Sequence, residues 1–221
     1  MARSLRCRSV TKGCEVATAK TAEARAPDGG IAGESGANDT FRRRLLEAMA
    51  ESLAVNGYCN TTVADIVRIA RTSRRTFYEY FPDREACFVA LLTGNNDELI
   101  RAITAAVDPK APWDAQVRQA VEAWIAAAQS RPALMQAWIR DAPGLGAEAQ
   151  RLQHEFMQAF IDMVQALSTT AGIGPVSRQR AIMLLGGLHQ LTDVTFQDTG
   201  RLDDITEEAV NASIALLAPR T

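Results

Sequence analysis

A short segment of this chain, Ser73–Tyr80, concentrates side chains that form directional hydrogen bonds. It reads Ser-Arg-Arg-Thr-Phe-Tyr-Glu-Tyr. An arginine guanidinium can bind O6 and N7 of guanine as a fork, and hydroxyl groups can bind phosphate oxygens. Arg74 and Tyr78 are four residues apart and share one helical face, with Arg75 beside them. These residue types and spacings suit non-covalent recognition of bases and phosphates, although a basic helix face is also typical of an ordinary solvated surface.

The charge of the chain is unevenly distributed, although its formal net charge is only −2. Between Phe41 and Arg84, eight basic and five acidic residues give a net charge of +3. From Glu85 to the end of the sequence, 10 basic and 16 acidic residues give a net charge of −6. This asymmetry suggests that one part of the chain meets a polyanion and the other does not.

Caps and helix breakers predict which elements position the polar segment. Three short helices are expected over residues 41–56, 63–70 and 74–81, followed by a long helix over 83–107. Order is expected to begin at an N-cap near Asp39 or Thr40, and Pro82 ends the third helix because the residue before proline disfavours the helical region. The buried stripe of the first helix is predicted from apolar residues four apart, Leu45, Met49 and Leu53.

The remainder of the chain also has helical periodicity. Further helices are expected over residues 113–129, 133–140, 147–170, 177–198 and 205–217. No alternating strand pattern accompanies them, which predicts an all-α protein. Residues 1–38 have almost no large apolar side chains and are predicted to be a flexible tail, either a basic arm that touches DNA phosphates or a solvated extension. The predicted domains are 39–82 and 83–221.

The polar segment lies within the run NGYCNTTVADIVRIARTSRRTFYEYFPDREACFVALL. Residues 44–92, which contain this run, resemble the DNA-binding domain of the tetracycline-repressor (TetR-like) family of bacterial regulators. The matching positions are Gly57-Tyr58, Thr61-Thr62-Val63, Asp65-Ile66, Ala70, Ser73, Thr76-Phe77-Tyr78, Tyr80-Phe81 and Glu85-Ala86. Where the family usually has glycine and then valine after Ala70, this chain has Arg71 and Thr72. Arg71 must therefore adopt the turn without the freedom of glycine.

The resemblance implies a helix-turn-helix that binds double-stranded DNA. The residues expected to contact phosphates are Arg42, Thr62, Tyr78, Tyr80 and Arg84. The residues expected to reach base edges are Ser73, Arg74, Arg75 and Thr76. Glu79 is four residues after Arg75 and can hold it on the helix surface, but exposed pairs contribute only about 0.3–0.5 kcal/mol, so DNA should win that competition.

The resemblance also implies that the larger helical domain binds an effector. Aromatic residues and one histidine are the candidate effector contacts, namely Trp124, Trp138, Phe156, Phe160 and His189. Such a lining would suit a hydrophobic or aromatic small molecule. Each of these residues is equally typical of a helical core, and a histidine there can be hydrogen-bonded in a core or an interface.

The last two long helices are expected to form a homodimer. Their apolar stripes contain Leu184, Leu188, Leu191, Ala209, Ala212 and Leu216. Gly186-Gly187 would allow close helix approach; alternatively, both stripes face the core of the monomer. A dimer would hold two recognition helices about 34–36 Å apart on a palindromic operator. The hypothesis is a repressor released when an effector shifts the helix over 83–107.

Other classes of protein are less consistent with the sequence. The four cysteines form no CxxC pair and only two histidines are present, so neither a metal site nor a cofactor is predicted. No paired Cys/His, HExxH spacing or phosphate-binding glycine loop indicates an enzyme. No apolar run predicts a membrane span or a secretory signal, and we expect a cytoplasmic protein. The alternatives are a helical enzyme and an adaptor that binds only protein, which would leave the Ser73–Tyr80 chemistry unexplained.

Overall fold

Residues 34–218 are described by a computed structural model, with side chains from Asp39 onward, and they form helices joined by loops. The helices are α1 (Glu34–Asn60), α2 (Val63–Ile69), α3 (Arg74–Tyr80), α4 (Arg84–Ala106), α5 (Trp113–Ser130), α6 (Pro132–Arg140), α7 (Ala147–Thr170), α8 (Arg178–Asp198) and α9 (Thr206–Leu217). Two short 3-10 helices are η1 (Ala142–Gly144) and η2 (Leu202–Ile205). The described residues contain no strand, which confirms the all-α prediction.

The helix α1 extends further than expected at both ends. It begins at Glu34, before the expected N-cap at Asp39 or Thr40, because no proline interrupts this stretch. Residues 34–38 of the predicted tail are helical, and its other residues, 1–33, lie outside the described part of the chain. Gly57 breaks the helix with φ +69°, a conformation that favours glycine, and one more turn follows it.

Side-chain caps begin the next three helices. Thr62 caps α2, Ser73 caps α3 and Asp83 caps α4, each accepting a hydrogen bond from a backbone N–H three residues later. These caps agree with the predicted ones. The helix α4 is continuous through Gly94, a residue that often weakens a helix.

Large apolar side chains hold α2 and α3 against the part of α1 that begins at Arg44. Leu45, Ile66 and Phe77 are fully buried in one cluster, and Phe81 is 4% exposed. The ring centroids of Phe77 and Phe81 are 5.8 Å apart. Because α3 has only seven residues, this packing and not helix propensity must hold it in place.

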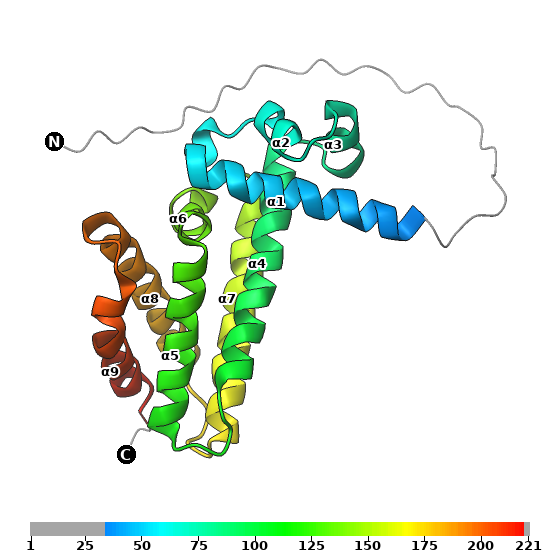
Figure 1. The fold of residues 1–221 in the computed structure, drawn as a ribbon. Coiled ribbons are helices and arrows are strands. Elements are labelled where there is room, and N and C mark those ends of the chain that lie inside the picture. Colours follow the sequence, from blue (N-terminus) through cyan, green and yellow to red (C-terminus); the bar gives the residue numbers. More distant parts are fainter. Residues whose placement is uncertain (1–33, 219–221) are drawn as a thin grey trace. The chain divides into compact units, whose positions relative to one another are not determined.

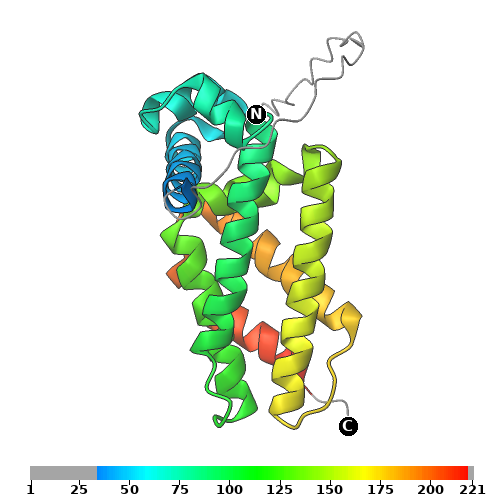
Figure 2. The same cartoon turned by 90° about the vertical axis from the view of Figure 1, so that its right-hand side faces the viewer.

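The long helices α4, α5 and α7 run alongside one another (Figures 1 and 2). The helix α4 packs against α5 and α7, α5 packs against α9, and α8 packs against both α7 and α9. Arg180 of α8 donates hydrogen bonds to the carbonyls of Leu216 and Ala218, which caps the C-terminal end of α9. The buried apolar cluster is continuous from α1 to α9.

From Arg44 onward, the described residues belong to one compact unit. The predicted division into residues 39–82 and 83–221 is not tested by this arrangement and stays a prediction. None of the helices in residues 34–218 combines the length and hydropathy needed to cross a bilayer. The same residues contain no group of three His, Cys, Asp or Glu side chains arranged to hold a metal ion.

Candidate nucleic-acid interface and internal cavity

Several hydrogen-bonding side chains lie together at the first turn of α3. Ser73 accepts a hydrogen bond from the backbone N–H of Thr76 over 3.0 Å, and the two hydroxyl oxygens are also 3.0 Å apart. Ser73 and Arg74 are exposed, and Thr76 is half-buried. The structure therefore brings together the side chains that were predicted to reach base edges, at one end of a short capped helix.

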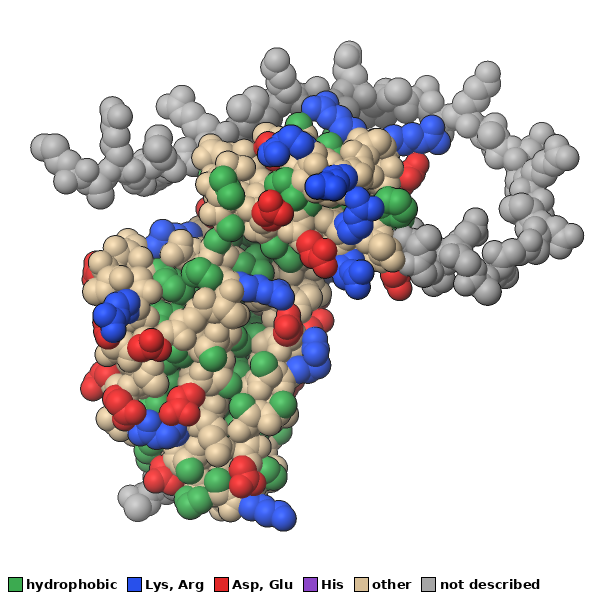
Figure 3. All heavy atoms as spheres, in the orientation of Figure 1, with side chains coloured by type: hydrophobic (Ala, Val, Ile, Leu, Met, Phe, Trp, Pro, Cys, Tyr) green, Lys and Arg blue, Asp and Glu red, His purple; other side chains and the backbone are tan. Residues whose placement is uncertain are grey.

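The outer face of α3 is polar and basic. Arg74 is exposed and Tyr78 is 55% exposed, whereas Phe77 between them is fully buried. Arg75 pairs with Glu79 over 3.2 Å, as the spacing predicted, but its side chain is 90% exposed. Figure 3 shows basic side chains gathered over α2 and α3, while both signs of charge are mixed over the longer helices. An exposed pair of this kind is weak enough for a phosphate or a base to replace Glu79.

The turn between α2 and α3 contains a residue in the left-handed region. Arg71 has φ +49°, which confirms that it adopts the turn without glycine's freedom. Arg44 of α1 supports this turn by donating hydrogen bonds to the carbonyls of Ala70 and Arg71, the latter over 3.3 Å. This role of Arg44 was not predicted from the sequence. Its guanidinium satisfies carbonyls at the end of α2, which helps to set the angle between the two helices.

Replacing Arg71 with glycine should raise the free energy of unfolding by about 0.5–1 kcal/mol. The left-handed conformation costs a non-glycine residue about 1–2 kcal/mol, and glycine's larger unfolded-state entropy offsets part of that gain. Thermal or urea denaturation would measure the change. Arg71→Ala is the matched control, because it removes the same charge but keeps the strained backbone. Equal stability of the two variants would contradict this explanation.

Two predicted phosphate ligands have partners within the protein. The Thr62 hydroxyl donates to Asp65 over 2.6 Å, and its backbone N–H donates to the same carboxylate over 3.1 Å. These hydrogen bonds lower the pKa of Asp65, so a charged carboxylate lies at the start of α2. Arg84 donates to the carbonyls of Thr61 and Tyr58 over 2.6 and 3.1 Å, and its guanidinium lies 4.4 Å from the centre of the Tyr58 ring.

The phosphate-binding roles of these residues stay predictions. Arg84 has a clear structural role, since it holds the turn between α1 and α2 from the first residue of α4. The Thr62 backbone N–H donates to Asp65. Of the remaining predicted phosphate ligands, Arg42 is exposed and Tyr80 is half-buried.

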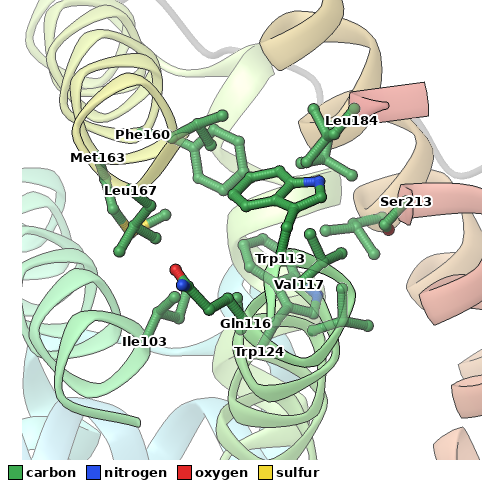
Figure 4. A pocket seen from close by; sticks show the side chains of 15 residues that line it. Ile103, Trp113, Gln116, Val117, Trp124, Phe160, Met163, Leu167, Leu184 and Ser213 are labelled. Carbon is green, nitrogen blue, oxygen red and sulfur yellow. The ribbon is translucent and has the colours of Figure 1, made fainter. Parts of the chain in front are cut away.

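A second candidate site is an apolar cavity between the long helices. The space measures about 40 Å³ and is lined by residues of α4, α5, α7, α8 and α9. Figure 4 shows Trp113, Trp124 and Gln116 of α5 facing Phe160, Met163 and Leu167 of α7 across it. None of the residues that line it carries a charge. An apolar lining of this kind would suit a hydrophobic or aromatic ligand, but the space has room for only about three water molecules.

The five predicted effector residues form one aromatic cluster, but only Trp124 and Phe160 line the cavity. The ring of His189 lies 5.3 Å from Trp124 and 6.4 Å from Phe156, and Trp138 contacts Phe156 at 5.3 Å between centroids. Burial lowers the pKa of His189 to about 4, so the imidazole is neutral at pH 7. His189, Phe156 and Trp138 therefore do not line the cavity but pack in the aromatic cluster that includes Trp124.

The most unusual residue of the cavity, Gln116, was not predicted from the sequence. It is only 2% exposed and lies on the apolar face of α5, one turn from Trp113 and two from Trp124. A glutamine on an otherwise apolar stripe was visible in the sequence as a polar exception. Attention to the aromatic residues alone does not detect it.

Three of the six predicted dimer contacts are buried in the single chain, and the dimer contacts stay a prediction. Leu184, Leu188 and Ala209 are buried within the monomer, and the two leucines line the cavity. Leu191 and Leu216 are half-buried, and Ala212 is exposed. The helix α8 carries two apolar stripes, one buried and one exposed, and the predicted leucines Leu184 and Leu188 belong to the buried stripe. That exposed stripe contains Ile182, Met183 and Val194, which are 37%, 61% and 42% exposed.

Comparison with known proteins gives a consistent result for the N-terminal helices. Residues 45–91 match the family described as bacterial regulatory proteins, tetR family. An uncharacterized HTH-type transcriptional regulator, YdgC of Bacillus subtilis, is 40% identical over 52 residues, or 24% of this chain and 27% of YdgC. The HTH-type transcriptional regulator EthR of Mycolicibacterium smegmatis is 27% identical over 148 residues, or 64% of this chain and 63% of EthR. Both matches thus span less than two thirds of the relative.

Residues 45–91 thus match the DNA-binding region of the tetR family. The fold of the chain over the longer helices is also that of solved regulators. The crystal structure of the transcriptional regulator FadR from Bacillus subtilis, in complex with stearoyl-CoA, superposes with a TM-score of 0.68. The alignment covers 81% of this chain and 99% of FadR at 14% sequence identity, so it shows the shared fold alone. The matched residues 45–91 contain α2 and α3, and Ser73 is the N-cap of α3.

Proposed function

We propose that this protein is a sequence-specific DNA-binding transcriptional regulator of the TetR family that acts as a homodimer on a palindromic operator. The observation that carries the proposal is the construction of α3. Phe77 and Phe81 anchor the helix in the core, while Arg74 and Tyr78 are exposed on its other face. A helix held this way can enter the major groove without losing its packing.

The contacts divide by chemistry into base and phosphate contacts. Ser73, Arg74, Arg75 and Thr76 lie at the N-terminal end of α3, where a recognition helix reaches base edges. Tyr78, one turn further on, presents its hydroxyl for a phosphate. The net positive charge of residues 41–84 favours approach to DNA, and this contribution weakens as salt rises.

Replacing Arg74 with alanine should weaken operator binding about 5–150-fold and relax the preference for one base pair. A bidentate arginine–guanine contact contributes about 1–3 kcal/mol of discrimination. Fluorescence anisotropy with the operator and with a scrambled duplex would measure both effects.

The matched control for Arg74 is Arg101→Ala, because Arg101 is an exposed arginine on α4, outside the helix-turn-helix. Arg74→Ala and Arg101→Ala remove the same charge. An equal loss of affinity in the two variants would mean that Arg74 contributes charge but reads no base.

The dimer interface is proposed to lie on the exposed apolar stripe of α8. Of the six large apolar side chains exposed in the described residues, three are on this helix, Ile182, Met183 and Val194. Gly186 and Gly187 lie between them, with nothing within 4 Å of where a Cβ would stand. Small residues there permit close approach of a second helix, and Ala212 of α9 offers a neighbouring exposed small side chain.

The double substitution Met183→Glu with Val194→Glu should convert the dimer to monomers and weaken operator binding at least about 100-fold. Two carboxylates on each copy would be buried without partners, at several kcal/mol each. Sedimentation velocity would report the mass. Val55→Glu is the control, because Val55 is 80% exposed but lies on α1. A dimer that survives the double substitution would place the interface elsewhere.

Ligand control is proposed to act through α4, which contacts both candidate sites. Near its start, Phe88 packs against Tyr58 of the helix-turn-helix with 4.4 Å between ring centroids, and near its end Ile103 lines the cavity. Glu85 in its first turn accepts a hydrogen bond from the N–H of Gly146, just before α7, over 2.9 Å. A ligand that moves α7 relative to α4 would therefore disturb α4 at the end nearest to α3.

The proposed outcome is release from the operator, with coupling of about 1–3 kcal/mol, or roughly 5–150-fold in affinity. A regulator with this fold, FadR of Bacillus subtilis, was crystallised in complex with stearoyl-CoA, which supports a ligand-responsive role. Operator affinity measured with and without a bound ligand tests the release. If every ligand that fills the cavity leaves DNA affinity unchanged, the release mechanism is wrong.

A further inference from the structure

The apolar cavity contains one polar side chain whose orientation is determined by its neighbours. The Gln116 amide nitrogen donates to the carbonyl of Ala111 over 2.8 Å and lies 3.4 Å from that of Pro109. The amide nitrogen must face these carbonyls, because the amide oxygen in its place would put two acceptors against each other. The Gln116 carbonyl oxygen is therefore the group left over. It is fully buried and has no hydrogen-bond partner.

An unsatisfied acceptor in this position requires an explanation. Leaving a buried polar atom without a partner is costly, and such atoms are uncommon in folded proteins. Figure 4 shows the Gln116 amide extending from α5 toward Ile103 and Leu167, across the space between the helices. Ser213, another polar residue in the lining, already donates to the carbonyl of Ala209 over 2.6 Å.

The rest of the lining restricts the charge of an occupant. No lysine, arginine, aspartate or glutamate lines the cavity, so an ionised group would enter without a counter-charge. The indole N–H groups of Trp113 and Trp124 are buried without partners in the same wall. They can donate to an oxygen atom, whereas Gln116 can only accept. The free donors and the free acceptor of the cavity therefore match a neutral group that both donates and accepts hydrogen bonds.

We propose that the cavity binds an uncharged, mainly apolar molecule bearing a hydroxyl or amide N–H, which donates to the Gln116 carbonyl oxygen. This inference rests on the proposed function and specifies the ligand class of its effector site. The space of about 40 Å³ is smaller than such a ligand. Binding must therefore displace wall side chains, and Met163 is unbranched and flexible.

Three probes of equal chain length separate the possibilities: 1-octanol, methyl octanoate and octanoate. The alcohol donates and accepts, the ester only accepts, and the carboxylate is charged. Binding is measured by tryptophan fluorescence, since two indoles lie in the wall, and by calorimetry. On the wild-type protein, we expect 1-octanol to bind about tenfold more tightly than either of the other probes, which corresponds to about 1.4 kcal/mol.

Gln116→Met removes the acceptor while keeping a long flexible side chain, and it should abolish the preference for the alcohol over the ester. The matched control is Gln150→Met, because Gln150 is exposed near the start of α7. Equal binding of alcohol and ester to the wild type, or a preference that survives Gln116→Met, would overturn the inference. Tightest binding by octanoate, or no binding of any probe, would also overturn it.

The proposed function is tested separately by operator binding in the same samples. If 1-octanol binds as expected but operator affinity does not change, the ligand class stands and the release mechanism fails. If the protein binds its operator but none of the probes, the ligand class fails and the DNA-binding function stands. If Gln116→Met does not fold, the difference between alcohol and ester on the wild type still decides the question.

Discussion

Replacing Phe77 with alanine is expected to lower the free energy of unfolding by about 3–5 kcal/mol, the usual cost of truncating a buried phenylalanine. Phe77 is fully buried, and its ring lies 5.8 Å from that of Phe81 and 5.4 Å from that of Tyr78. No nearby flexible segment would fill the resulting space, because α3 is capped at one end and Pro82 follows it closely at the other. Urea denaturation followed by circular dichroism would measure the change.

The neighbouring residue is the matched control. Tyr78 is 55% exposed, so Tyr78→Ala should change stability by no more than about 0.5 kcal/mol while weakening DNA binding. The two substitutions thus separate packing from recognition at adjacent positions of one helix. Similar losses of stability in the two variants would show that the outer face of α3 is packed and is not available to DNA.

Acidification should destabilise the protein through His189. Burial holds the pKa of this imidazole at about 4 in the folded protein, against an ordinary value of 6.5. Between these values the unfolded chain binds the proton and the folded protein does not, so stability is complete above pH 6.5 and falls as the pH drops toward 4. The expected loss between about pH 7.5 and 4.5 is about 2–3 kcal/mol from this residue.

Other groups titrate over the same range, so the effect of His189 must be isolated by substitution. His189→Leu should reduce the loss of unfolding free energy between about pH 7.5 and 4.5 by about 2–3 kcal/mol. His154→Leu is the control, because His154 is an exposed histidine on α7. An unchanged pH dependence in His189→Leu would mean that the imidazole is hydrated or has a partner in solution.

Local signals in the sequence predicted the helices well, because caps and breakers act over a few residues. Ser73 and Asp83 begin helices as expected, and the bounds of α7 agree with the prediction. The start of α1 was missed because Asp39 and Thr40 are good caps but are also tolerated within a helix. A local signal can show that a helix is able to begin at a residue without requiring it to begin there.

The sites were harder to predict because they depend on which face of each helix turns inward. On α8, Leu184 and Met183 are adjacent apolar residues, yet one is 8% and the other 61% exposed. Only the packing of α8 against α7 and α9 decides between them. Similarly, the partners of Arg84 are backbone carbonyls more than 20 residues earlier in the chain, which residue types alone do not identify.

The central claim, that this protein reads DNA sequence with α3, is tested most directly by selecting duplexes from a randomised library. The wild-type protein and Arg74→Ala would be compared at several salt concentrations, and the retained duplexes sequenced. We expect an enriched palindrome whose half-site centres lie about one helical turn apart, with a base preference that disappears in Arg74→Ala. Weak retention without sequence preference, fading as salt rises, would contradict the claim.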